Sequence, residues 1–209
     1  MNKSILISIR PEHVVKILNG EKTLELRKSV PTDFKNIIKK HGGIWVNIYV
    51  TKAKPFVYTD YATNEDGYTY ISGYGLTNLS YEPRILNGKV VARFWFDEFE
   101  KYTWFDGYGF SDGHGRYGAQ KENGLIENIV DKLCLDEVEG IDEYGQGKDL
   151  FVWHIKQLEI FDEPKELKDF HYYKTKTVYS GMDCPPYVDE VKQTLRKAPQ
   201  SWQYVWEKE

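Results

Sequence analysis

The sequence predicts a mixed α+β protein, built as a small mixed β-barrel whose openings are filled by flanking helices. Segments rich in apolar and β-branched residues lie between turn signals, as strands do. The stretches between these segments have very uneven lengths, which argues against a doubly wound sheet or an eight-unit barrel. Neither an internal repeat nor a linker divides the 209 residues, so we expect one domain over residues 1–209.

The first 28 residues predict a strand, a helix and a second strand. Residues 4–10 form a compact apolar run, and Pro11 suits the first turn of the helix that follows. Apolar residues then recur at helical spacing until Gly20, which suits a helix end. The second strand, residues 22–28, alternates two leucines with charged residues.

The rest of the chain predicts further strands and helices around two unpatterned segments. Residues 56–85 and 102–124 are rich in aromatic residues and glycine, and we expect them to be loop insertions. The other expectations rest on apolar periods and on Gly or Pro boundaries. They are a short basic helix or loop over 31–40, strands over 44–51, 89–99, 149–155 and 158–161, helices over 125–133 and 135–144, a helical turn over 164–170, a loop over 171–186, a helix over 187–197 and a strand over 198–206.

The composition predicts a globular protein of the cytoplasm. Hydrophobic residues make up 41% of the chain and charged residues 29%. No apolar run approaches the roughly 20 residues of a membrane span, and the N-terminal run is too short for a signal peptide. We therefore expect no membrane association. Cys134 and Cys184 lack the spacing of metal ligands and are expected to be free thiols.

The net charge of −4 hides a basic N-terminal third. Residues 1–54 contain 11 Lys or Arg and 4 Asp or Glu, a balance of +7, while the rest of the chain contains 17 and 28, a balance of −11. A basic region of this kind attracts phosphate. The alternative is that the two parts neutralise each other across the fold.

Common catalytic motifs are missing from the sequence. It contains no P-loop, no dinucleotide-binding Gly-x-Gly-x-x-Gly in a strand-to-helix context, no Gly-x-Ser-x-Gly and no His-Glu-x-x-His. The histidines are scattered, so no metal ligand set can be read from their spacing. We therefore expect neither a metal site nor a cofactor.

The segment from Gly20 to Lys28 carries the most chemical information. In a strand, Glu25 and Arg27 point away from the leucines. Because the opening strand needs burial on both sides, we expect these charges to line a cleft. A bend between helix and strand would bring Lys22 and Glu25 to one cavity. There the lysine could act as a base or nucleophile, or the two groups could form an ion pair that braces a barrel mouth.

Two other segments carry candidate binding groups. His154 lies in a strand pattern and points away from Trp153; such a histidine either packs within the fold or belongs to a site. Gln200, Ser201 and Trp202 combine an amide, a hydroxyl and an indole, which suits base recognition. They equally suit a tail whose tryptophan fills the core and whose polar groups satisfy the backbone.

These motifs resemble those of a known family. Gly20-x-Lys22-x-x-Glu25-x-Arg27, after a strand and a Pro-started helix, resembles the signature of the ASCH domain, a branch of the PUA-like superfamily. Further matches follow in order along the chain and leave out the two expected insertions. They are Ile7–His13, Ile48–Lys52, Leu86–Val91, Phe151–Ile155, Phe161–Leu167 and Pro199–Trp202, of which the last three look like a subgroup carried by phages and prophages.

The resemblance implies a PUA-like barrel with a cleft that faces RNA or a nucleotide, since the family is generally regarded as RNA-binding. Some small members are amidohydrolases that deacetylate acetylated cytidine with a Lys, a Thr and a Glu, and a ribonuclease activity is attributed to a member. By motif position the catalytic lysine would be Lys22. The position of the threonine nucleophile holds Glu25, which has no hydroxyl, and Thr23 lies in the wrong register.

Three functions are therefore expected as alternatives. The first is binding of RNA, another nucleic acid or a nucleotide through the charged cleft. The second is a hydrolase acting on RNA or a modified nucleoside, with Lys22 and Glu25 as tentative catalytic residues. The third is a protein-interaction module of a phage that meets a host protein through the aromatic insertions. The residues expected to contact nucleic acid are Lys22, Glu25, Arg27, Lys28, Tyr49, Lys52, Trp153, His154, Gln200, Ser201 and Trp202.

Overall fold

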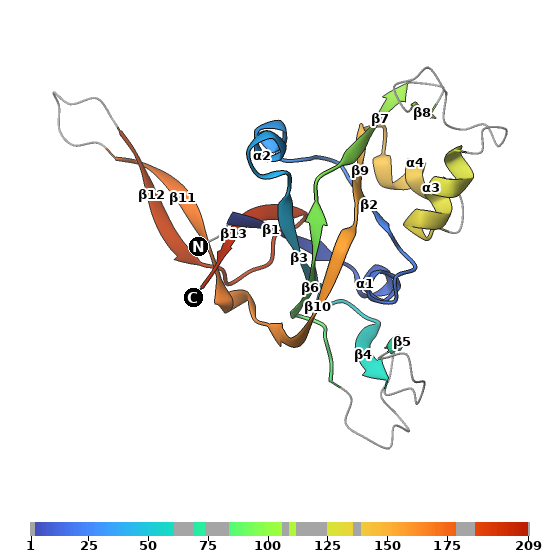
Figure 1. The fold of residues 1–209 in the computed structure, drawn as a ribbon, viewed down its shortest axis with the longest axis horizontal. Helices are drawn as coiled ribbons and strands as arrows, with labels where there is room; N and C mark the ends of the chain where they lie inside the picture. The colour runs from blue at the N-terminus through green and yellow to red at the C-terminus, as the bar shows by residue number, and fades with distance from the viewer. Residues whose placement is uncertain are drawn as a thin grey trace.

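Two β-sheets that share an apolar core form the body of the protein (Figure 1). The computed structural model describes residues 3–60, 69–73, 84–105, 109–111, 125–135, 139–178 and 187–208. The larger sheet consists, in spatial order, of β10 (Lys156–Lys165), β6 (Val90–Phe96), β3 (Ile44–Val50), β1 (Lys3–Ile9), β13 (Trp202–Glu207), β11 (Phe170–Val178) and β12 (Tyr187–Thr194). The smaller sheet consists of β2 (Leu24–Arg27), β9 (Leu150–His154), β7 (Phe99–Phe105) and β8 (Gly109–Ser111).

Helices cover the sheets on two sides. In the described part of the chain they are α1 (Pro11–Leu18), α2 (Phe34–His41), α3 (Leu125–Leu133), α4 (Glu139–Gly145) and one 3-10 turn at Leu167–Asp169. The apolar residues of α1 and α2 belong to the core between the sheets, whereas α3 packs on the other face of the smaller sheet. Among the described residues, no helix is long and apolar enough to cross a membrane.

The first strand is buried on both faces because it lies in the middle of the larger sheet. It pairs in parallel with β3 and antiparallel with β13. Ile5 and Ile7 face the core between the sheets, while Leu6 faces a second apolar cluster that contains Val205 and Phe170. This double burial explains the near-continuous apolar run at the start of the sequence.

The two sheets are joined at one corner. β6 leads directly into β7, and β9 leads directly into β10, so two neighbouring chain segments pass from one sheet to the other. At the crossing the backbone N–H of His154 donates to the carbonyl of Glu98 over 3.2 Å. Inside, Phe96 stacks on Trp153 with ring centroids 4.2 Å apart. The predicted α+β class is confirmed, and the barrel takes the form of two sheets closed at this corner.

The β11–β12 hairpin corrects two expectations. The sequence predicts a loop over 171–186 and a helix over 187–197, but β11 and β12 pair from His171↔Thr194 to Val178↔Tyr187. The hairpin projects from the body (Figure 1), and most of its side chains are exposed. Because little of the hairpin beyond Phe170 and His171 at its base is buried, neither strand needs the alternating apolar pattern by which strands are recognised.

The expected insertions also contain strands. β4 (Phe56–Asp60) and β5 (Thr69–Gly73) pair antiparallel, and β7 continues through Phe105 to pair with β8. The remaining parts of the insertions, residues 61–68, 74–83, 106–108 and 112–124, lie outside the described residues, as does Cys184. The expected helical turn over 164–170 is shorter, because β10 runs to Lys165 and only Leu167–Asp169 turn.

Candidate nucleic-acid or nucleotide cleft

A cavity of about 640 Å³, which we call the cleft, opens beside β2. Lys22 and Glu25 line it from the α1–β2 turn and from β2, His13 lines it from α1, and Gln200 from the segment before β13. Its volume lies within the range of pockets that hold small organic ligands. The charged face of the second strand therefore meets an enclosed space, as the alternation of its residues predicts.

Three ionic side chains form the wall of the cleft. Lys22, Glu25 and Arg27 are only 4%, 6% and 6% exposed. An Arg27 Nη2 lies 2.8 Å from Glu25 Oε1, and Lys22 Nζ lies 3.6 Å from Glu25 Oε2. One carboxylate thus serves two cations. We call these three residues the buried triad.

The end of α3 holds the lysine of the triad in place. Lys22 Nζ donates to the backbone carbonyl of Leu133 over 2.8 Å, and Lys16 Nζ donates to that of Cys134 over 3.1 Å. The last carbonyls of a helix lack intrahelical partners and carry partial negative charge, so they attract cations. Because Lys22 lies in the turn before β2, its side chain can reach Glu25, which a straight strand would not allow.

Both faces of β2 are covered, by different partners. Leu24 packs with Ile129 and Leu133 of α3 on one face. On the opposite face, an Arg27 Nη2 donates to the carbonyl of Ser8 in β1 over 2.9 Å. The apolar face therefore holds β2 against α3, and Arg27 on the polar face connects β2 to β1 of the larger sheet.

Burial shifts the protonation of two cleft groups. It lowers the pKa of Lys22, chiefly because the ammonium loses water, and the nearby Glu25 carboxylate opposes this shift. It also lowers the pKa of His13; Glu25 opposes that shift while Lys22 adds to it. At neutral pH His13 is therefore uncharged and can either donate or accept a hydrogen bond.

Several polar atoms of the cleft have no hydrogen-bond partner among the described residues. They are Nε of Arg27, Nδ1 of His13 and Oγ1 of Thr51, and all three residues line the cavity. A buried donor or acceptor without a partner costs about 1–3 kcal/mol, so such groups call for an explanation. A ligand that supplies acceptors and donors at this place would satisfy them.

An aromatic side chain lies at the rim of the cleft. Tyr144 of α4 lines the cavity with 39% of its surface exposed. Partial burial raises the pKa of its phenol, and Arg27 acts in the opposite direction. Lys28 Nζ lies 5.3 Å from the centre of the Tyr144 ring and 3.4 Å from Gln146 Oε1, so it borders the same rim.

The remaining predicted residues lie apart from the cleft. Trp153 is fully buried in the core, and His154 contacts Glu100 over 3.0 Å on the opposite side of the strand. Trp202 donates its indole N–H to Ser29 Oγ, 3.0 Å away, and the carbonyl of Ser201 accepts from Ser8 N. Lys52 and Tyr49 line a neighbouring cavity of about 390 Å³. Burial and the nearby Glu166 raise the pKa of the Tyr49 phenol.

The cleft also contains residues that the sequence does not single out. His13, Thr51 and Tyr144 come from α1, the end of β3 and α4. His13 closes the Ile7–His13 match, and Thr51 lies in the Ile48–Lys52 match, so a signal for these two exists. Tyr144 lies outside every match, and nothing in its local sequence points to the cleft.

The arrangement suits an anionic or hydrogen-bonding ligand better than a metal. Among the described residues, no group of three or more His, Cys, Asp or Glu is placed to hold a metal ion. The cationic members of the triad outnumber its carboxylate, and Arg10, Glu143 and several neutral polar side chains line the same cavity. Such a wall can bind phosphate or the acceptor edge of a base, while Glu25 can accept from a base amine.

Comparison with known proteins finds relatives only among solved structures. No protein-family model and no curated protein matches the chain. The crystal structure of ASCH from Zymomonas mobilis is 14% identical over 78% of this chain and 73% of that one, with a TM-score of 0.43. A mutant of the same protein is 13% identical over 96% and 87%, with a TM-score of 0.47. These structures carry the name of the family that the motifs resemble; at this identity the likeness says nothing of a ligand or reaction.

Proposed function

We propose that the cleft binds one nucleotide unit of RNA or another nucleic acid, or a free nucleotide. The observation that carries the proposal is the buried triad, in which two enclosed cations share one carboxylate. Charges are costly to remove from water, and polar atoms beside them have no hydrogen-bond partner among the described residues. A phosphate or a polar base edge would complete this set. The sequence resemblance to a family regarded as RNA-binding agrees with it.

Each part of the cleft has a place in this proposal. Arg27 and Lys22 donate to phosphate or to base acceptors, and Glu25 fixes the orientation of Arg27. The half-exposed ring of Tyr144 offers a flat surface on which a base can stack. Gln200, at the far side of the cleft, supplies an amide that can both donate and accept.

A matched pair of tyrosines tests the stacking role. Tyr144→Ala should weaken binding of single-stranded RNA by about 1–3 kcal/mol, as loss of a stacked base does in other proteins. Tyr173→Ala is the control, because Tyr173 is 37% exposed, close to Tyr144, but lines none of the described cavities. Fluorescence anisotropy with labelled RNA and DNA, titrated against salt, measures both. No binding by the wild-type protein at low salt would contradict the proposed function.

Hydrolysis of RNA or of a modified nucleoside is the second candidate. The observation that favours it is the lowered pKa of Lys22, whose Nζ lies 3.6 Å from a carboxylate oxygen. A lysine that loses its proton more easily than usual can act as a general base or nucleophile, and Glu25 can exchange protons with it. The absence of a hydroxyl at position 25 separates this chemistry from a threonine-based amidohydrolase.

Turnover of defined substrates tests this candidate. The protein is incubated with acetylated cytidine and with RNA oligomers, and the products are separated by chromatography. Lys22→Met keeps the length of the side chain and removes the amine, so it should abolish any turnover. Lys16→Met is the control, because Lys16 also donates to the end of α3 but does not line the cleft. Equal turnover in the two variants would remove Lys22 from the reaction.

The remaining expectations stay predictions. The cytoplasmic location and the phage or prophage origin agree with a nucleic-acid ligand but do not follow from it. The host-protein partner depends on the aromatic insertions, most of which lie outside the described residues.

A further inference from the structure

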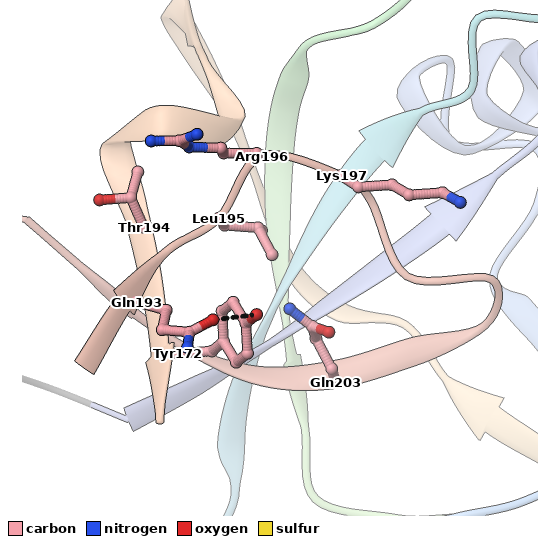
Figure 2. Close-up of a pocket in the computed structure, with 7 residues that line it drawn as sticks. All are labelled: Tyr172, Gln193, Thr194, Leu195, Arg196, Lys197 and Gln203. Carbon is pink, nitrogen blue, oxygen red and sulfur yellow. Dashed lines mark hydrogen bonds between the residues drawn. The ribbon is translucent and has the colours of Figure 1, made fainter. Parts of the chain in front are cut away.

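Three cavities form a continuous series along one side of the protein. The cleft shares Ser8, Thr51 and Gln200 with the neighbouring cavity of about 390 Å³. That cavity shares Arg196 and Lys197 with a third cavity of about 500 Å³ at the base of the β11–β12 hairpin (Figure 2). Because neighbours in the series share wall residues, the cavities adjoin one another, and the second cavity begins where the cleft ends at Gln200.

Unpaired cations mark the second and third cavities. Lys52, Arg196 and Lys197 are exposed, and within the described part of the chain none of them forms a side-chain ion pair or hydrogen bond with another residue. We call these three residues the basic track. Among the described residues, no acidic side chain lines either cavity. This differs from other surface cations such as Lys156, which contacts two carboxylates.

The connection between β12 and β13 presents two of these cations. Figure 2 shows Arg196 and Lys197 extending in opposite directions from this segment, while Leu195 points inward. Leu195 is only 2% exposed and packs in the second apolar cluster, so it anchors the segment. The two exposed cations therefore directly follow a residue that is packed into the body of the protein.

The third cavity offers an aromatic ring and amides beside the basic track. Tyr172 donates its hydroxyl to Gln193 Oε1 over 2.7 Å, and Figure 2 shows the Gln203 amide pointing toward Tyr172. Nε2 of Gln203 is buried and has no partner among the described residues. Cations, a ring and a free amide donor are the groups that proteins place along single-stranded nucleic acid.

We propose that a single strand of nucleic acid, with one nucleotide in the cleft, continues along the basic track to the hairpin. This inference rests on the proposed function and specifies its ligand as a strand of several nucleotides. A free nucleotide needs only the cleft, and would leave the three track cations without a role. A duplex cannot place a base in the cleft without unpairing it, whereas a single strand can.

Length-dependent binding tests the proposal. Uridine monophosphate and oligouridines of about two to ten residues are titrated against the wild-type protein and against Arg196→Ala/Lys197→Ala. Lys39→Ala/Lys40→Ala is the control, because it removes two exposed lysines at the end of α2 that line none of these cavities. Affinity of the wild-type protein should rise with oligomer length, and a duplex should bind more weakly than a single strand.

The track variant should bind long oligomers about 10- to 30-fold more weakly near 0.1 M salt, with a slope of log Kobs against log salt smaller by about 1.4. Its affinity for uridine monophosphate and the behaviour of the control should be unchanged. The inference is overturned if oligomers bind no more tightly than the mononucleotide, if a duplex binds as well, or if the track variant equals the control. Those results leave the cleft intact as a nucleotide site, whereas failure of every nucleotide probe to bind the wild-type protein removes the proposed function itself.

Discussion

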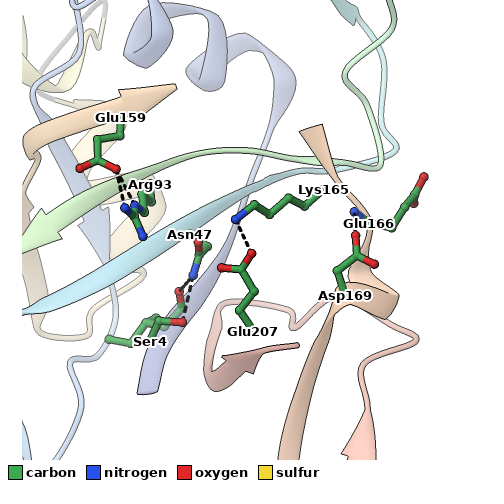
Figure 3. Close-up of polar contacts among 9 residues, drawn as sticks. Ser4, Asn47, Arg93, Glu159, Lys165, Glu166, Asp169 and Glu207 are labelled. Atoms are coloured by element: carbon green, nitrogen blue, oxygen red, sulfur yellow. Dashed lines mark hydrogen bonds and ion pairs between the residues drawn. The ribbon is translucent and has the colours of Figure 1, made fainter. Parts of the chain in front are cut away.

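Charged residues are arranged by opposite rules inside the cleft and on the outer face of the larger sheet. On the sheet a cation has at least one carboxylate of its own, as Arg93 has Glu159 and Lys165 has Glu207 (Figure 3). These partners remain partly exposed to water. In the buried triad a single carboxylate faces two cations, and almost no water reaches them.

The two regions differ in their balance of charge. Each of these surface cations has a carboxylate as its partner, whereas the two cations of the buried triad share one. A surface pair contributes little to stability, since water already solvates both groups, and its loss is tolerated. A buried group depends on the few neighbours that the fold provides, so each neighbour has a large effect. An excess of buried cation is therefore expensive to keep, which agrees with the proposed anionic ligand.

Removal of the shared carboxylate should have the largest effect. Glu25→Ala leaves Lys22 and Arg27 buried together without an anion between them, and should lower the free energy of unfolding by about 3–5 kcal/mol. Urea denaturation followed by fluorescence measures it. Triple replacement of the triad by apolar residues of similar size should recover part of the loss. A loss below about 1 kcal/mol would mean that water reaches the triad freely.

A neutral buried network should give an intermediate effect. Asn47 Nδ2 donates to Ser4 Oγ over 3.0 Å and to the carbonyl of Ile5 over 3.3 Å (Figure 3). Asn47→Ala removes this donor within the sheet and should cost about 1–3 kcal/mol in the same denaturation experiment. Ser4→Ala combined with Asn47→Leu removes both polar partners and should cost less than Asn47→Ala alone. The opposite order would show that packing volume, not hydrogen bonding, sets the cost.

Lowering the pH should destabilise the protein through His13, whose imidazole is partly buried beside the cleft. Burial lowers the pKa of His13 below its ordinary value, so the unfolded chain takes up a proton at a higher pH than the folded protein does. Stability contributed by this residue is therefore complete above about pH 6.5 and falls as the pH drops from there toward the folded-state pKa. His13→Gln should show a smaller loss of thermal stability between about pH 7 and pH 5. Identical pH profiles of the wild-type protein and His13→Gln would show that the pKa of His13 is the same in the folded and the unfolded protein.

Loss of a surface pair should have the smallest effect. Glu159 is 47% exposed, and its carboxylate contacts Arg93 over 2.7 Å. Glu159→Ala should change the free energy of unfolding by less than about 1 kcal/mol, because the guanidinium remains solvated and stays near the Trp45 ring. Thermal melts at low and high salt measure this effect, and salt should reduce it further. A change as large as that of Glu25→Ala would erase the distinction between the two regions.

Local alternation was enough to predict the shared direction of Glu25 and Arg27, whereas Lys22 needed a bend before the strand. Glu25 and Arg27 share the face opposite Leu24, and the strand before them leaves no room for a solvated face. The partners of the triad could not be predicted, because Leu133 and Tyr144 come from helices more than a hundred positions further along the chain. Only the folded chain brings them to the cleft.

The same limit explains what was missed in the fold. Strands that are buried on both faces, such as β3, can be recognised from their composition. The β11–β12 hairpin buries almost nothing, and its stability comes from backbone pairing that leaves no trace in the side chains. Trp153 shows the opposite kind of error. Its position in a matched segment suggested a contact with nucleic acid, but the side chain is fully buried and stacks on Phe96 in the core.

The position of β1 between β3 and β13 has a consequence for synthesis of the protein. Ser4 Oγ donates to the carbonyl of Val205, a residue 201 positions away. While the chain grows on the ribosome, one edge of β1 therefore stays without its partner until β13 has emerged. Gln200 reaches the cleft in the same late step. A nascent chain from which β13 has not yet emerged therefore exposes an unpaired edge of β1, to which other strands can add.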